Sequence, residues 1–274
     1  MHMALDLTSR AEFLRGLSPR AGDLARAGFV ARTAGTFTLK GPQDFLTETD
    51  LAVESFIRAE LGAAFAHDAI LGEEGGGDPA ARLWIIDPVD GTANFARGVP
   101  HFCVCICFCE DGVPVLGAIF HPMTGEFWFA QSGKGAQKNG APMSVTLTTN
   151  PNVACVEMGW SRRHSISGYL AAQGHILTAG ANIRRGGSGA LALAWVAEGR
   201  SDGYLEAAMN CWDCLAGMLM VQEAGGSVLP FGPDATDRLS DLAALTAPHS
   251  VRACTPALAP LLDSALSLAA EPDR

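Results

Sequence analysis

Two carboxylates stand together at the end of an apolar run, in the segment LWIIDPVDGTANF. Asp87 and Asp90 lie three residues apart across a proline, and a turn fixed by that proline can aim both side chains at one point. Hard cations such as Mg²⁺ bind carboxylate oxygens of this kind. Gly91 and Thr92 then open a predicted helix, whose free N–H groups and dipole favour a phosphate beside the cation. The alternative is an ordinary Asp-Pro turn without a ligand.

Other acidic residues fit the same chemistry. Glu73 and Glu74 follow an apolar pair and precede three glycines in ILGEEGGG, and Asp213 lies in the first turn of a helix predicted from NCWDCLAG. Asp44 stands in GPQDFLTETD. Each also has a simpler interpretation, which is a solvated acidic loop for the two glutamates and helix capping for the two aspartates.

Composition limits the partners. The net charge is −10 and no run of basic residues is longer than a pair, so the sequence lacks the basic patch that is typical of nucleic-acid-binding proteins. An anionic substrate would approach against this field, and it would need bound cations or aimed N–H groups. The longest apolar run has eight residues, whereas a bilayer span needs about 20. The N-terminus does not resemble a secretion signal and the cysteines do not resemble a disulfide framework, so we expect a cytoplasmic protein. From the charge pattern and the short apolar runs we expect that it binds neither nucleic acid nor membrane.

The segment HFCVCICFCE places four cysteines at every second position, which resembles an array of metal ligands. In a strand the outer two, Cys103 and Cys109, would be about 20 Å apart. One metal ion cannot gather ligands so far apart. The residues between them are apolar, so the pattern predicts a strand buried on both faces.

The surrounding pattern predicts two α+β halves that meet near residue 150. In the first, a helix over about residues 10–33 leads through a loop or hairpin to a second helix that begins near Thr49. Closely spaced strands follow from Leu83 to Gln131 and predict an antiparallel or mixed sheet. In the second half, strands and helices alternate, and the helix of WDCLAGMLMVQEAGG ends at a glycine pair.

Five motifs in this order resemble segments of the inositol monophosphatases, a family of the lithium-sensitive, magnesium-dependent sugar phosphatase superfamily. They are DFLTETD, GEE, WIIDPVDGTANF, GGSGALAL and CWDCLAGMLMVQEAGG, between about residues 10 and 266. The resemblance implies an α+β fold, the layered α/β/α/β/α sandwich of the fructose-1,6-bisphosphatase and inositol monophosphatase type. It implies one domain over residues 1–274, with subdomains of about 1–148 and 149–274, and a homodimer.

The same resemblance implies two or three Mg²⁺ ions. Asp87 would bridge two of them, Glu73 and the Val89 carbonyl would complete one site, and Asp90 with Asp213 would complete the other. A third, weaker ion would lie near Glu73. Water would be the nucleophile, so no covalent enzyme intermediate is needed.

Catalytic and substrate-binding roles also follow from the resemblance. Glu73 and Thr92, with Asp44 nearby, would orient and deprotonate the water, and the Gly91 and Thr92 N–H groups would hold the phosphate. Glu206 would contact substrate hydroxyls, although a surface position on a strand is equally consistent with the sequence. The loop of Gly187, Ser188 and Gly189 would line the same pocket.

The expected activity is Mg²⁺-dependent hydrolysis of inositol 1-phosphate or a related polyol monophosphate. Asn210 and the short loop GGGDPAAR depart from the family pattern near the pocket and leave the substrate open. Histidinol-phosphate phosphatase and a broad-specificity sugar phosphatase are the alternatives within the superfamily. A catalytically silent relative that binds phosphates or partners, and a cysteine-based metal or redox protein, are the alternatives from other classes.

Overall fold

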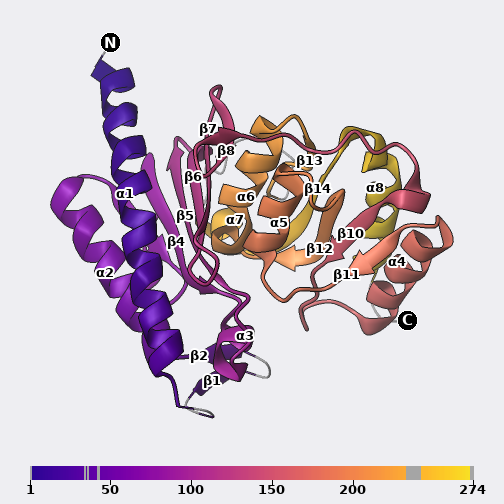
Figure 1. Ribbon diagram of the computed structural model, residues 1–274, viewed down its shortest axis with the longest axis horizontal. Coiled ribbons are helices and arrows are strands. Elements are labelled where there is room, and N and C mark those ends of the chain that lie inside the picture. The colour runs from indigo at the N-terminus through magenta and orange to yellow at the C-terminus, as the bar shows by residue number, and fades with distance from the viewer. Residues whose placement is uncertain (1, 34, 36, 42–43, 233–241, 272–274) are drawn as a thin grey trace.

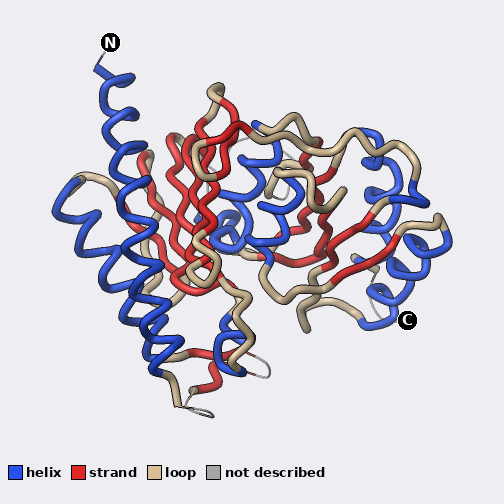
Figure 2. Tube along the Cα trace, viewed as in Figure 1, coloured by secondary structure: helices blue, strands red, loops and turns tan. Residues whose placement is uncertain are grey.

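Helical and sheet layers alternate across the molecule (Figures 1 and 2). The computed structural model describes residues 2–33, 35, 37–41, 44–232 and 242–271. Helices α1 (His2–Ala31) and α2 (Glu48–Ala64) cover the outer face of the first sheet, and α5 (Gly189–Ala197) and α6 (Cys211–Glu223) lie between the two sheets. Helices α4 (Ile166–Thr178) and α8 (Ala259–Ala269) cover the second sheet. The layered α/β/α/β/α sandwich expected from the sequence is confirmed.

The first sheet has seven strands in the order β3-β4-β5-β6-β7-β8-β9. Strands β3 and β4 are parallel and the remaining neighbours are antiparallel, which confirms the predicted mixed sheet. The strands are β3 (Ala69–Gly72), β4 (Arg82–Asp90), β5 (Cys103–Glu110), β6 (Val113–His121), β7 (Glu126–Gln131), β8 (Gly135–Lys138) and β9 (Ala141–Pro142).

The second sheet has five strands in the order β11-β10-β12-β14-β13. Strand β10 (Cys155–Met158) runs parallel to β11 (Asn182–Arg184) and β12 (Gly203–Met209), while β14 (His249–Cys254) is antiparallel to β12 and β13 (Ser227–Val228). Strands β11 and β13 are too short to show a period of two in the sequence.

Smaller elements complete the described fold. Strands β1 (Thr38–Gly41) and β2 (Asp44–Leu46) pair antiparallel, which agrees with the hairpin considered after the first helix. Helix α3 (Thr92–Arg97) follows β4 directly. The short helix α7 (Leu242–Thr246) and the 3₁₀ turns Pro151–Val153 and Pro256–Leu258 lie in the second half.

The four cysteines of β5 are core residues, as predicted. Their side chains are at most 2% exposed and lie in the cluster that contains α5 and α6. Phe102, Val104, Ile106 and Phe108 lie in the cluster on the other side of the sheet, together with apolar residues of α1 and α2. Helices therefore cover β5 on both faces, which explains why the strand has no polar face. No helix among the described residues has the length and apolar character needed to cross a membrane.

Candidate active site

Asp87 and Asp90 are brought together by an irregularity in β4. Asp87 pairs with Cys105 and Asp90 with Cys103, so three steps along β4 correspond to two along β5. In a regular strand residues three apart face opposite sides of the sheet, and one extra residue removes this difference. Both carboxyl groups are buried, and each contacts the helical layer between the sheets, Asp90 at α5 and Asp87 at α6.

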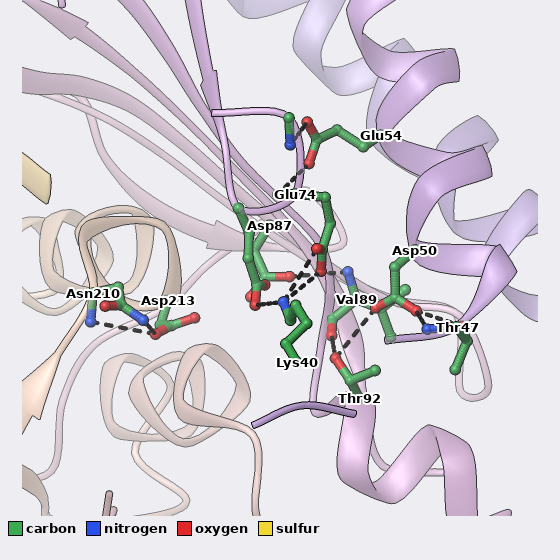
Figure 3. A network of polar contacts seen from close by, with 12 residues as sticks. Lys40, Thr47, Asp50, Glu54, Glu74, Asp87, Val89, Thr92, Asn210 and Asp213 are labelled. Carbon is green, nitrogen blue, oxygen red and sulfur yellow. Dashed lines mark hydrogen bonds and ion pairs between the residues drawn. The ribbon is translucent and has the colours of Figure 1, made fainter. Parts of the chain in front are cut away.

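Glu73 and Asp213 complete a cluster with Asp87. One carboxylate oxygen from each of these residues lies within 4.8 Å of the other two. Glu73 follows β3, and its N–H donates to the Ile86 carbonyl at 3.1 Å. Asp213 lies in the first turn of α6 and accepts hydrogen bonds from the Asn210 backbone N–H at 3.3 Å and side-chain amide at 3.2 Å (Figure 3).

These carboxylates repel one another in a buried setting. Burial, strengthened by the neighbouring acids, raises the pKa of Asp87 and of Asp213 well above the usual range, and burial raises the pKa of Glu73 to about 7. Among the described residues, the cation next to this cluster is Lys40, whose Nζ lies 3.1 Å from Glu73 Oε1 and 2.9 Å from Glu74 Oε1. An oxygen-only donor set of this kind, with Asp87 buried and Glu73 and Asp213 half-buried, fits Mg²⁺.

Asp90 links the two halves of the chain. Its Oδ2 atom accepts hydrogen bonds from the Ser188 hydroxyl and from the Ala190 N–H, the latter at 2.8 Å. Ser188 is also the N-cap of α5, where its Oγ accepts from the Leu191 N–H. Ser188 was predicted only to line the substrate pocket, and the structure gives it a second task, which is to fix the orientation of Asp90.

Thr92 lies beside Asp50, an aspartate in the first turn of α2. Its Oγ1 is 2.9 Å from the Val89 carbonyl oxygen and 3.2 Å from Asp50 Oδ1 (Figure 3). The other Asp50 oxygen accepts from the Thr47 backbone N–H at 2.9 Å and from the Thr47 hydroxyl. Burial raises the pKa of Asp50 to about 6.

Asp44 was the residue expected beside Thr92. Its backbone belongs to β2, but its side chain lies outside the described part of the structure. The carboxylate that contacts Thr92 is that of Asp50, in the TETD end of the same motif. The spacing of Thr47 and Asp50 is typical of a capping box, which is observed, but nothing in the local sequence indicates the contact between Asp50 and Thr92.

Two adjoining cavities contain the remaining predicted residues. A cavity of about 180 Å³ is lined by Glu73, Asp87, Val89, Asp90, Gly91, Thr92, Gly187 and Asp213, among others. A second cavity of about 190 Å³ is lined by Gly187, Ser188, Gly189, Tyr204 and Glu206, with Trp160 and Arg185. Asp90, Gly187 and Asp213 line both cavities, so a ligand can extend from one into the other.

Glu206 lines the second cavity. Its carboxylate accepts a hydrogen bond from the Tyr204 hydroxyl at 2.6 Å, and burial raises its pKa to about 7. A side chain at Gly159 would place its Cβ 1.8 Å from Glu206 Oε2, so any other residue here would displace the Glu206 carboxylate. Asn210, noted as a departure from the family pattern, donates to Asp213.

Nearly the whole chain matches one protein family. The model of the inositol monophosphatase family matches residues 6–265. The "Nus factor SuhB" of Xylella fastidiosa is 40% identical over 205 residues, 74% of each chain, and the "Inositol-1-monophosphatase" of Rhizobium meliloti is 39% identical over 194 residues, 69% of this chain and 73% of the relative.

A solved structure agrees with these matches. The suhB protein of Bartonella henselae superposes with a TM-score of 0.85 and 29% identity, over 94% of this chain and 98% of that one. The family match covers both sheets and every residue placed in the two cavities. The chain therefore belongs to the inositol monophosphatase family.

Proposed function

We propose that this protein is a Mg²⁺-dependent phosphomonoesterase that hydrolyses inositol 1-phosphate or a related polyol monophosphate. The observation that carries the proposal is the acidic cluster of Glu73, Asp87 and Asp213, which lines the same cavity as Thr92. Family membership supports a phosphatase, and the name of the Rhizobium meliloti relative supports the substrate class.

The acidic cluster would hold two or three Mg²⁺ ions. The ligands would be Glu73, Asp87, the Val89 carbonyl, Asp90 and Asp213. When bound, the ions supply charge for the phosphoryl oxygens and lower the pKa of a water molecule.

Thr92 and Asp50 would manage the proton of the attacking water. The Thr92 hydroxyl can accept a proton from water while it donates its own to Asp50 Oδ1, 3.2 Å away. The two Thr47 donors hold the other Asp50 oxygen, so this carboxylate cannot turn away from Thr92. Glu73 would orient the same water, and the Gly91 and Thr92 N–H groups would hold the phosphate.

Glu206 would select the rest of the substrate. A carboxylate repels a second phosphate and accepts hydrogen bonds from hydroxyl groups, so a polyol monophosphate should be preferred over a bisphosphate. The ammonium group of histidinol phosphate would also suit a carboxylate, which keeps histidinol-phosphate phosphatase as the alternative. A broad-specificity sugar phosphatase would show no strong preference.

Phosphate release from a panel of esters tests the substrate class. The panel contains inositol 1-phosphate, histidinol phosphate, fructose 1,6-bisphosphate and glycerol 2-phosphate, each with wild type and Glu206→Gln. An amide still bonds hydroxyl groups, so we expect the variant to keep inositol 1-phosphate hydrolysis within about 10-fold, a change below about 1.4 kcal/mol. Much faster hydrolysis of histidinol phosphate by wild type, lost in Glu206→Gln, would identify the alternative substrate instead.

A second candidate function is that of a Nus factor, the name of relatives from Xylella fastidiosa and Pseudomonas aeruginosa that are 40% and 39% identical. A host that lacks its own copy of this gene can separate the two functions. Complementation by wild type but not by Asp213→Asn would favour the phosphatase. Equal complementation by both would show that the function in the cell does not need the acidic cluster.

A further inference from the structure

We propose that Glu54 and Arg58 of α2 are positioning residues that hold Glu73 in place for a cation. Neither residue lines the two cavities described above. They act on the glycine-rich loop that follows β3 and carries Glu73. The inference rests on the proposed metal-dependent function, and it assigns to this ion pair a task that the mechanism has not used.

Glu54 binds the loop through both of its carboxylate oxygens. Its side chain is 4% exposed. Its Oε2 accepts from the Glu74 N–H at 2.9 Å, and its Oε1 accepts from the Gly75 N–H at 2.8 Å (Figure 3). These are the two peptide groups that directly follow Glu73. A buried carboxylate with charge-assisted bonds to two successive amides therefore fixes the backbone at this ligand.

Arg58 binds the same loop through carbonyl groups. Its Nε donates to Glu54 Oε1 at 2.7 Å, which completes the ion pair. Its other nitrogens donate to the Gly76 carbonyl and, at 3.5 Å, to the Ile70 carbonyl. The guanidinium group thus joins the end of the loop to the strand that precedes it, and the pair engages both donors and acceptors of the loop backbone.

The glycines of the loop leave room for the Glu54 carboxylate. A Cβ atom would lie 2.3 Å from Glu54 Oε1 at Gly72 and 2.6 Å from the same atom at Gly75. Any other residue at either position would therefore displace the Glu54 carboxylate from the loop. This approach accounts for two of the four glycines in LGEEGGG.

Such a loop needs an external support. Glycine-rich backbone loses much conformational entropy when it is ordered. The loop itself closes with the two hydrogen bonds between Gly72 and Gly76, both 3.0 Å. Glu73 must also stay beside Asp87 and Asp213, which repel it while no cation is bound. Bonds from a buried ion pair to the adjacent peptide groups oppose this repulsion.

Calorimetric titration with Mn²⁺, a probe for the Mg²⁺ site, tests the proposal without an activity assay. Glu73→Gln first identifies the binding step that depends on Glu73. In Glu54→Gln, one of the positions now taken by carboxylate oxygens becomes an NH₂ group that faces an N–H donor. We expect this variant to raise the Kd of that step by about 10-fold or more, the usual range for residues that orient metal ligands. We expect kcat at saturating Mg²⁺ to stay within about 3-fold of wild type.

Glu60→Gln is the matched control. Glu60 also lies on α2 and forms an ion pair with Arg20 at 2.7 Å, but this pair lies at the protein surface. We therefore expect Glu60→Gln to bind Mn²⁺ with the Kd of wild type. A wild-type Kd in Glu54→Gln, with only a lower melting temperature, would overturn the proposal. If Glu54→Gln does not fold, Arg58→Lys replaces it in the test, because lysine keeps the positive charge but lacks the planar guanidinium group that bonds Glu54 and the loop carbonyls. The same change in Kd is expected for Arg58→Lys, and a wild-type Kd would overturn the proposal. Wild type that binds no Mn²⁺ would instead contradict the proposed function.

Discussion

Replacement of Asp50 by asparagine should interrupt the proposed proton path with little change in shape. The Thr47 backbone N–H, 2.9 Å from Asp50 Oδ2, can only donate. The amide oxygen of the new side chain must therefore face Thr47, and its NH₂ group must face Thr92. An NH₂ group cannot accept a proton from the Thr92 hydroxyl, which would then donate only to the Val89 carbonyl oxygen.

The size of the effect follows from the role of the lost group. A positioned general base contributes about 10²- to 10⁴-fold to a rate. At about 1.36 kcal/mol for each factor of ten, this is about 3–5 kcal/mol of transition-state stabilisation. Asp50 also lies at the N-terminus of α2, where loss of its capping interactions costs about 0.5–2 kcal/mol of stability. We therefore expect kcat to fall by about 100-fold or more in a protein that still folds.

The assay is steady-state phosphate release at saturating Mg²⁺, with thermal unfolding of each variant as the check on folding. Glu48→Gln is the control, because Glu48 is an exposed acid in the same helical turn. Asp44→Asn, made in parallel, tests the assignment that the sequence suggested. A folded Asp50→Asn variant with kcat within about 3-fold of wild type would refute the Thr92–Asp50 relay. A large loss of kcat in Asp44→Asn but not in Asp50→Asn would assign the acceptance of the Thr92 proton to Asp44 instead.

Three further outcomes are expected. Asp90→Asn or Asp213→Asn should lower turnover by at least about 100-fold with the fold retained, because each removes a proposed metal ligand, and near-normal rates in either would refute the site. Cys107→Ala should lower the free energy of unfolding by about 1–2 kcal/mol, as expected for a small buried group, and leave bound metal unchanged; loss of a stoichiometric metal ion would contradict this. The contribution of His121 to stability should be lost as the pH drops from about 6.5 towards 4, because burial beside His101 lowers the pKa of His121 to about 4 and the unfolded chain takes up the proton first, whereas the buried acids with raised pKa values act in the opposite direction. The free energy of unfolding of wild type minus that of His121→Gln should therefore be smaller at pH 5 than at pH 7, and an equal difference at both values would exclude this contribution.

Local patterns predicted the parts of the site that lie in one segment. The apolar run before Asp87 and the glycine before Thr92 predicted a strand that leads into a helix, and β4 and α3 are observed. The turn expected at the proline between Asp87 and Asp90 is wrong, because β4 continues through Pro88 to Asp90 with an irregularity in its pairing. The alternation of cysteine with larger apolar residues predicted the buried strand β5. These features depend on residues that are neighbours in the chain.

Contacts between distant segments were not predictable in the same way. DFLTETD offers two aspartates, and the one that contacts Thr92 is decided by the packing of α2 against the end of β4. The bond from Ser188 to Asp90 joins residues 98 positions apart, and that from Glu54 to the Gly75 amide spans 21. Glu54 lies in an ordinary helical pattern, so nothing in the local sequence distinguishes it from Glu60, which lies on the same helix at the protein surface and is partly exposed.

The most direct test is phosphate release from inositol 1-phosphate while Mg²⁺ is titrated into wild-type protein freed of metal by a chelator. We expect no release without Mg²⁺, a rate that rises to saturation as Mg²⁺ is added, and a loss of at least about 100-fold in Asp213→Asn under the same conditions. Failure to release phosphate at any Mg²⁺ concentration, or release that is independent of Mg²⁺ and unchanged in Asp213→Asn, would contradict the assignment of this acidic cluster as the catalytic centre of a metal-dependent phosphatase.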